Sequence, residues 1–308
     1  FCCGVASNIE DQEKYTFEQM LTNVMFALAQ SKEASSENIC FFDEEVHKKK
    51  EFENFIESNM QQALDSQCFE MVLQPKMDLK TNSVIAAEAL VRWRLEDGTY
   101  LPPSSFVDIF EKNLFCSKLD FYMLKKAIQQ IRKWIDMGMN PVNISVNQSK
   151  IVFYHENYIS EIKSLLEEYN VSGSYITLEV LESTVIEDID MFNSILTEVK
   201  KLGFSVSLDD FGSGYSSLNV LSKLQIDELK IDRIFLHTKS EVDNQRTKWI
   251  LESIIDIAKK SQILVVVEGV ESKQDDLFIK NIGADIGQGY FYGRPLSISA
   301  FNDLIETK

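Results

Sequence analysis

The chain has 308 residues, of which 44% are hydrophobic, so it can bury a large core in one domain with a smaller piece beside it. Its formal net charge of −17 would repel the phosphate backbone of a nucleic-acid duplex, which excludes a duplex-binding protein. A small phosphorylated ligand is compatible with this charge if metal ions reverse its sign locally.

Cysteine spacing and hydropathy indicate the compartment. The five cysteines form no CxxC pair or metal-ligand spacing, which is typical of reduced thiols in a cytoplasmic protein. No apolar run approaches the roughly 20 residues of a membrane helix, and no signal peptide is recognisable, so we expect this fragment to make no membrane contact. The chain begins at Phe1 rather than Met, which indicates a fragment whose longer parent can still be membrane-associated.

The first 66 residues predict a small α/β piece followed by a connecting helix. Apolar residues recur at helical spacing over residues 15–33, and a second apolar stripe runs through residues 46–66. A piece of about 45 residues cannot bury much core alone. We therefore expect residues 1–45 to be the remnant of a truncated domain, joined by the helix 46–66 to residues 67–308.

From residue 67 onward, short β-rich runs alternate with helical stretches. Eight strands are expected, at 69–76, 83–93, 141–147, 175–181, 204–209, 226–232, 263–269 and 285–287. A polar turn of hairpin length, Asp78–Asn82, makes the first pair antiparallel. This arrangement predicts an α/β fold, a (β/α)8 TIM-like barrel with an irregular antiparallel first strand. A doubly wound sheet is the structural alternative, and the even spacing and the strand count favour the barrel.

One polar residue interrupts or ends most of these otherwise apolar strands. These residues are Glu88, Asn143, Glu179, Asp209 and Glu268. Each can be explained alone as half of a buried salt bridge, which is the commoner situation for any single case. Together they indicate one shared site, because the carboxyl ends of barrel strands converge on a single face.

Asp209 and Asp210 lie side by side where the apolar run Phe204–Leu208 ends. Two adjacent carboxylates repel each other, and this repulsion markedly raises the pKa of one of the two unless a cation lies nearby. All side chains of the expected site are oxygen ligands, which suit Mg²⁺ or Mn²⁺ rather than zinc. One ion cannot neutralise so many acids, so we expect two ions bridged by Asp209, an arrangement that serves in-line phosphoester hydrolysis.

Strand alternation places further side chains beside this site. Leu90 and Arg92 share a strand face with Glu88, and a guanidinium group in that position suits a substrate phosphate. Lys230 and Asp232 likewise share one face of their strand. Lys230 can position or deprotonate the attacking water, and the alternative is a structural ion pair.

These residues also carry a family resemblance. The run Glu88–Trp93 (EALVRW) resembles the signature of EAL domains, the metal-dependent phosphodiesterases of cyclic diguanylate (cyclic di-GMP). Further blocks follow in family order: Gln74-Pro75, Asn143–Ser145, Glu179–Glu182, Asp209–Leu218, Asp227–Asp232, Glu268–Glu271, Gln288–Tyr290 and Pro295. The similarity covers residues 67–308, and the combined set is highly specific.

The resemblance implies a role for each site residue. One metal ion would be held by Glu88, Asn143, Glu179 and Asp209, and the second by Asp209, Asp210 and Glu268. Lys230 would hold the water with Glu271 in support, and Glu182 would anchor the Asp-Asp loop. The implied substrate contacts are Gln74, Leu90, Arg92, Asp232, Gln288 and Pro295. Leu181 and Ser213 stand where the family usually has threonine, which puts the loop anchoring in question rather than the metal binding.

The leading piece is similar to the C-terminal end of a GGDEF (diguanylate cyclase) domain. Residues 3–6 resemble its last strand, residues 15–33 its final helix and residues 38–43 its exit strand. The Gly-Gly-Asp-Glu-Phe signature is absent from these residues, so no cyclase activity is assigned to the chain.

The leading hypothesis is an active phosphodiesterase, in which a water activated by two metal ions opens cyclic di-GMP to linear pGpG. The alternative is a non-catalytic receptor that binds the dinucleotide and signals through a partner, and the complete ligand set with Lys230 favours the enzyme. An unrelated metal-dependent barrel enzyme, such as an enolising lyase, would share the carboxylates but not the loop after Asp210. The resemblance also allows a homodimer through the barrel.

Overall fold

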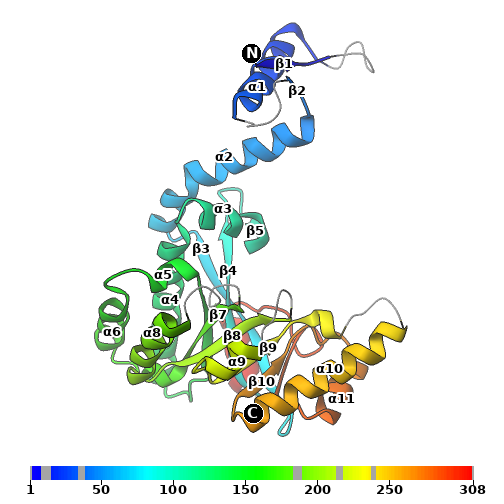
Figure 1. Cartoon of the computed structure of the whole chain (residues 1–308). Helices are drawn as coiled ribbons and strands as arrows, with labels where there is room; N and C mark the ends of the chain where they lie inside the picture. The colour runs from blue at the N-terminus through cyan, green and yellow to red at the C-terminus, as the bar shows by residue number, and fades with distance from the viewer. Residues whose placement is uncertain are drawn as a thin grey trace. The chain divides into compact units, whose positions relative to one another are not determined.

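The computed structural model describes residues 2–7, 15–33, 39–182, 189–212, 218–236 and 241–306. Contacts divide the chain into two units, Phe1–Gln62 and Ala63–Lys308. The division falls inside the helix α2 (Glu44–Asp65), which begins two residues before and ends one residue before the connecting helix expected at 46–66 (Figure 1). No helix in the described ranges combines the length and the apolar character needed to cross a membrane.

The first unit is built on two short parallel strands and a helix between them. Strands β1 (Cys3–Val5) and β2 (Ile39–Phe41) pair in parallel, and α1 (Phe17–Glu33) packs against them. Gly4 permits this packing, because a Cβ at that position would lie 2.3 Å from the backbone nitrogen of Leu28. The helix α1 also carries three exposed apolar side chains: Phe17, Leu21 and Met25.

The second unit is a closed barrel, and this confirms the fold predicted from the sequence. Its strands are β3 (Phe69–Asp78), β4 (Ser83–Arg94), β6 (Asn143–Gln148), β7 (Ile176–Leu181), β8 (Ser205–Phe211), β9 (Glu228–Ile231), β10 (Leu264–Val267) and β11 (Ile286–Gln288). The order β3-β11-β10-β9-β8-β7-β6-β4 is closed by a further pairing of β3 with β4. This closure rules out the open, doubly wound sheet.

Strand β3 is the irregular member of the barrel. It runs antiparallel to both neighbours, β4 and β11, whereas the other neighbouring pairs around the barrel are parallel. The turn between β3 and β4 is fixed by Asp78, whose Oδ1 accepts hydrogen bonds from the backbone nitrogens of Lys80 and Thr81. A two-residue strand, β5 (Tyr100–Leu101), extends the sheet beyond β4.

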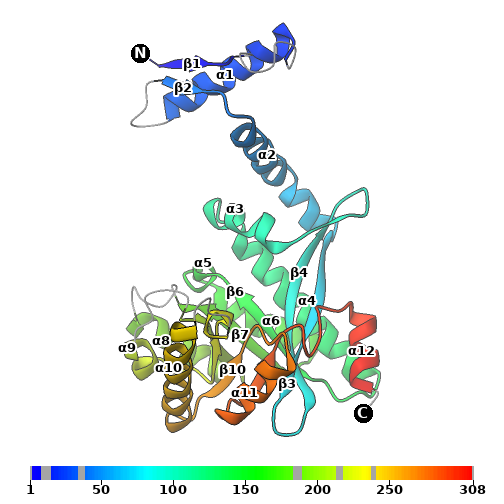
Figure 2. The same cartoon turned by 90° about the vertical axis from the view of Figure 1, so that its right-hand side faces the viewer.

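Helices cover the outside of the barrel (Figure 2). The α-helices that the structure describes in this unit are α3 (Val107–Lys112), α4 (Cys116–Asp136), α5 (Lys150–Phe153), α6 (Tyr158–Tyr169), α8 (Ile189–Lys201), α9 (Leu218–Lys223), α10 (Glu241–Lys260), α11 (Lys273–Asn281) and α12 (Ile298–Glu306). Single turns of 3-10 helix occur at η1 (Pro103–Ser105), η2 (Gly173–Tyr175) and η3 (Arg233–Phe235). The C-terminal helix α12 packs beside β3 and α4, where Trp134 Nε1 donates to Asn302 Oδ1.

Alternation along the strands makes the outer layer apolar and the barrel interior polar. Ile144 and Val146 of β6 are buried against the helical layer, and Ser145 between them points inward. Leu229 of β9 is likewise completely buried on the outer face, whereas its neighbour Lys230 enters the interior. Burying polar groups in this way favours partners inside the barrel, and among the described residues Ser207 Oγ and Gln288 Oε1 are buried without a hydrogen-bond partner.

Candidate functional site

The carboxyl ends of the strands bring the predicted acidic residues together. Two groups of carboxylates each lie within 4.8 Å of one another, judged by one oxygen atom per residue. The first group is Glu88, Glu179 and Asp209, and the second is Asp209, Asp210 and Glu268. Asp209 belongs to both groups, which is the position expected for a residue that bridges two cations.

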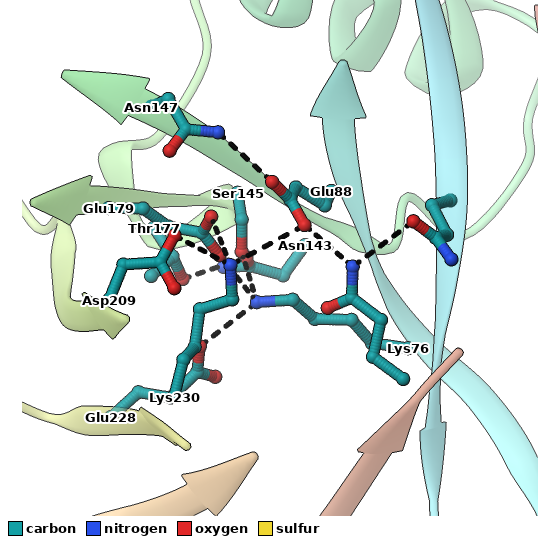
Figure 3. A network of polar contacts seen from close by, with 12 residues as sticks. Lys76, Glu88, Asn143, Ser145, Asn147, Thr177, Glu179, Asp209, Glu228 and Lys230 are labelled. Atoms are coloured by element: carbon teal, nitrogen blue, oxygen red, sulfur yellow. Dashed lines mark hydrogen bonds and ion pairs between the residues drawn. The ribbon is translucent and has the colours of Figure 1, made fainter. Parts of the chain in front are cut away.

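Lys230 contacts four of these five carboxylates, and Figure 3 shows it beside Glu88, Glu179 and Asp209. Its Nζ is 2.8 Å from Asp209 Oδ2 and 2.8 Å from Glu268 Oε1. It is also 2.9 Å from Glu179 Oε2 and 3.4 Å from Glu88 Oε2. In the described part of the chain these four are its carboxylate partners, so Glu271, the expected support, is not one of them.

Burial and charge act in opposite directions on the pKa values of this cluster. Burial raises the pKa of Glu88, Asp209 and Glu268, to about 7 for Asp209, even though Lys230 acts to lower all three. Burial also acts to raise the pKa of Glu179, but Lys230 and Lys76 outweigh it and hold that pKa at about 2. The cluster therefore favours additional positive charge.

Asp210 occupies a strained backbone conformation. Its φ of +56° lies in the left-handed region, and the pairing of β8 with β9 shifts register between Leu208 and Phe211. This bulge turns Asp210 toward the mouth of the barrel instead of the outer layer, so two successive aspartates serve one site. Burial, together with repulsion from Asp232, raises the pKa of Asp210.

The structure does not bring Asn143 to this cluster. Asn143 is the first residue of β6, where its Nδ2 donates to the backbone oxygen of Ser174 and its Oδ1 accepts from Thr177 Oγ1. Asn147, four residues later on the same face, donates from Nδ2 to Glu88 Oε1 at 3.0 Å. The expectation is corrected to Asn147, because in a parallel barrel the carboxyl end of a strand reaches the site.

Of the two glutamines beside the cluster, Gln288 holds Glu88 directly. Gln288 Nε2 donates to Glu88 Oε2 at 2.6 Å and approaches Gln74 Oε1 at 3.5 Å. Gln74 is paired with Glu88 in the register of β3 and β4. Gly289 lets the following turn approach the loop after β10, since a Cβ there would lie 2.2 Å from Val270 O. Both glutamines lie beside the carboxylates, and their expected contact with a substrate stays a prediction.

A pocket of about 310 Å³ opens directly above the carboxylates. It is lined by Gln74, Glu88, Asp210, Asp232, Arg233, Glu268, Gly269, Glu271, Gln288, Gly289 and Tyr290. Asp232 follows β9 and caps the short helix η3 by accepting from the Ile234 backbone nitrogen. Glu271 is exposed on this pocket's wall, so it faces the pocket rather than Lys230.

The remaining expected substrate residues lie around this pocket rather than in it. Leu90 lines a neighbouring pocket of about 380 Å³, together with Asn147 and Leu181. Arg92 is half-buried near the end of β4, and its Nη1 donates to the backbone oxygen of Val91. Pro295 precedes Leu296, which pairs with Leu73 of β3.

The anchor of the Asp-Asp loop is described only in part. Glu182 is buried immediately after β7, and Leu181 ends that strand beside Asp209. Ser213, the second departure from the family pattern, lies outside the described residues. The loop anchoring therefore remains a prediction.

Two buried charged residues near the site were missed by the sequence interpretation, Lys76 and Glu228. Lys76 has no exposed surface, and its Nζ contacts Ser145 Oγ, Glu179 Oε1 and Glu228 Oε1 (Figure 3). One signal was available, because Lys76 lies two residues after Gln74 and so shares its inward face. A lysine on the inward face of a barrel strand needs a carboxylate partner.

The fold and the site together define a TIM-like barrel protein with a candidate metal site at the carboxyl ends of its strands. The family model described as the EAL domain matches residues 57–295. This match covers more than half of the chain, and the chain therefore belongs to the EAL domain family.

Curated relatives and solved structures agree with this membership. The chain is 33% identical over 288 residues to the cyclic di-GMP phosphodiesterase NbdA of Pseudomonas aeruginosa, covering 94% of this chain and 36% of that protein. It is 27% identical to the cyclic di-GMP phosphodiesterase PdeR of Escherichia coli, covering 97% and 45% respectively. The chain thus spans less than half the length of either relative.

Among solved structures, the PaMucR phosphodiesterase in complex with c-di-GMP is 31% identical, with a TM-score of 0.74. That similarity covers 80% of this chain and 99% of the other. The EAL enzyme Bd1971, in its form bound to cAMP and cyclic di-GMP, is 25% identical with a TM-score of 0.76. That similarity covers 96% of this chain and 77% of the Bd1971 chain.

Proposed function

We propose that the chain is a cyclic di-GMP phosphodiesterase that opens its substrate to linear pGpG. The observation that carries the proposal is the convergence of four carboxylates on Lys230 beneath an open pocket. The names of the similar proteins support the substrate, because NbdA and PdeR are both cyclic di-GMP phosphodiesterases. The membership of the EAL domain family supports metal dependence.

The donor set fits two Mg²⁺ or Mn²⁺ ions. The ligand atoms are carboxylate oxygens joined by the amide of Asn147, which suit hard divalent cations. Six carboxylates face two ammonium groups: Glu88, Glu179, Asp209, Asp210, Glu228 and Glu268 against Lys76 and Lys230. Four negative charges are therefore in excess, and two divalent ions would balance them.

The residues around this site have separate tasks in the proposed reaction. When bound, the two ions would polarise the phosphodiester and lower the pKa of an attacking water. Lys230 has a pKa raised well above its ordinary value, because the carboxylates outweigh its burial, so it donates hydrogen bonds and accepts no proton. Lys230 was expected either to position or to deprotonate the attacking water. Because its ammonium group stays protonated, the positioning role is the one that is supported. Gln288 fixes the direction of Glu88 by its hydrogen bond to Oε2.

Two neighbouring pockets together offer room for a ligand larger than either one holds. The pocket above the carboxylates and the pocket of Leu90 meet at the Asn147–Glu88 hydrogen bond. Their volumes, about 310 and 380 Å³, each fall within the range of small-ligand sites. We assign Gln74, Leu90, Arg92, Asp232, Gln288 and Pro295 to substrate binding, and Glu271 to the pocket wall.

Incubation of the chain with cyclic di-GMP and Mg²⁺ or Mn²⁺ tests the function directly. We expect pGpG to accumulate, and we expect excess EDTA to stop its formation. The product is separated from the substrate by chromatography, and binding is measured in parallel by calorimetry. Binding of cyclic di-GMP without any turnover in either metal would instead support a receptor.

The choice between Asn143 and Asn147 gives a second test. We expect Asn147→Ala to lower kcat/KM by roughly 100-fold, because it removes a candidate metal ligand and the donor to Glu88 Oε1. Asn143→Ala is the matched control, since Asn143 starts the same strand on the same face, and we expect at least half of the activity to remain. Equal losses in the two variants would contradict the assignment.

We also propose that residues 1–45 are the C-terminal part of a GGDEF-like domain. A parallel two-stranded sheet with one covering helix supports this, because such a sheet normally continues into further strands. The exposed apolar side chains Phe17, Leu21 and Met25 on α1 are consistent with a surface that is covered in a larger domain.

A further inference from the structure

Lys76 is a second buried cation, placed one layer deeper in the barrel than the candidate site. In the register of β3 and β4, Gln74 lies opposite Glu88 at the mouth, whereas Lys76 lies opposite Ala86. The Lys76 side chain crosses the interior and meets residues from three other strands. Its Nζ lies 2.7 Å from Ser145 Oγ, 2.7 Å from Glu179 Oε1 and 2.9 Å from Glu228 Oε1.

These three contacts use all three N–H donors of the ammonium group. Lys76 has no exposed surface, and Glu228 is 7% exposed, so both charges are removed from water. An ion pair of this kind is weak evidence for stability, because desolvation of the two charges offsets much of their attraction. The contact of Lys76 with Glu179 therefore points to a role beyond stability.

Glu179 is held from two sides by two different lysines. Its Oε1 accepts from Lys76 below, and its Oε2 accepts from Lys230 above at 2.9 Å. Glu179 is itself completely buried, so its carboxylate has no contact with bulk solvent. As long as Lys76 occupies Oε1, the carboxylate cannot turn that oxygen toward the mouth, and Oε2 is the atom presented to the site.

We propose that Lys76, which also pairs with Glu228, is a positioning residue that fixes Glu179 as a ligand with a single oxygen. This inference rests on the proposed function, because Glu179 is a metal ligand only in a metal-dependent enzyme. Lys76 lies beneath the carboxylates and acts on the reaction through Glu179. It differs from Lys230, which lies among the carboxylates at the mouth.

The double variant Lys76→Met/Glu228→Gln tests this role. It removes one positive and one negative charge, so the net charge attracting a divalent cation is unchanged. Mn²⁺ binding is measured by calorimetry on the chelator-treated protein without substrate, and thermal unfolding is followed in the same buffer. We expect the double variant to unfold near the wild-type temperature but to bind its tighter Mn²⁺ at least tenfold more weakly. We expect kcat to fall while KM changes less than threefold.

Three further variants complete the design. Glu228→Gln alone keeps Lys76 on Glu179, so we expect its Mn²⁺ affinity to stay within threefold of wild type. Lys76→Met alone leaves Glu228 buried without its partner, and we expect it to unfold at a lower temperature than the double variant. Lys80→Met, an exposed lysine on the same hairpin, is the matched control and is expected to behave like wild type.

The outcomes separate this inference from the proposed function. If the wild-type chain binds Mn²⁺ and turns over cyclic di-GMP while the double variant binds Mn²⁺ equally well or more tightly, Lys76 is only a structural ion-pair partner. The same conclusion follows if Glu228→Gln loses as much affinity as the double variant. If the wild-type chain neither binds Mn²⁺ nor hydrolyses the dinucleotide, the proposed function fails and this inference fails with it.

Discussion

Replacing Asp209 by asparagine is expected to abolish hydrolysis of cyclic di-GMP while leaving the barrel folded. Asp209 is the one carboxylate shared by both acidic groups, and Asn offers no charge to either cation. Metal ions supply several kcal/mol of transition-state stabilisation, so kcat/KM should fall by roughly 10³-fold or more. The six interior carboxylates outnumber the two ammonium groups, so removing one carboxylate relieves repulsion, and Tm without divalent ions should equal or exceed that of wild type.

The control for this variant is Asp256→Asn. Asp256 lies on α10, where it forms an exposed ion pair with Lys260. Such a pair contributes little to stability, so activity and Tm should stay near wild-type values. Asp209→Asn with more than a tenth of wild-type turnover would refute the bridging role, whatever its effect on Tm.

The fold was predictable because its signals are local. Apolar alternation within each run marks a strand, and the short polar turn at Asp78 fixes β3 and β4 as an antiparallel hairpin. The carboxylates were predictable for the same reason, since a charge inside an apolar strand is conspicuous. Their convergence then follows from the parallel order of a barrel.

Asn147 was predictable from the sequence, because the expected strand 141–147 has its carboxyl end there, on the same face as Asn143. The contacts of Lys76 depend instead on distances that one sequence does not contain. The partners of Lys76 lie 69, 103 and 152 residues away along the chain. Those pairings exist only once the barrel has closed, so the place of Lys76 on the inward face of its strand was the only local sign of its burial.

The replacement of Lys230 by methionine should produce the second large effect. Four carboxylates lose a shared ammonium group, and their mutual repulsion then destabilises the folded state. We expect Tm to drop in EDTA and to recover when Mg²⁺ or Mn²⁺ is added, with a larger rise than in wild type, because an ion now relieves that repulsion. Turnover should nevertheless stay about 10²- to 10⁴-fold below wild type, since the donor that orients the water is gone.

This pairing of metal-restored stability with unrestored activity distinguishes a catalytic lysine from a merely structural one. Lys200→Met serves as the control, because Lys200 also pairs with a carboxylate, Asp227, just before β9 begins and away from the mouth. Its Tm should not respond more strongly to divalent ions than that of wild type. If metal restored both the Tm and the turnover of the Lys230 variant, Lys230 would act as a counter-charge alone, and the orientation of the water would have to be assigned to another residue of the pocket.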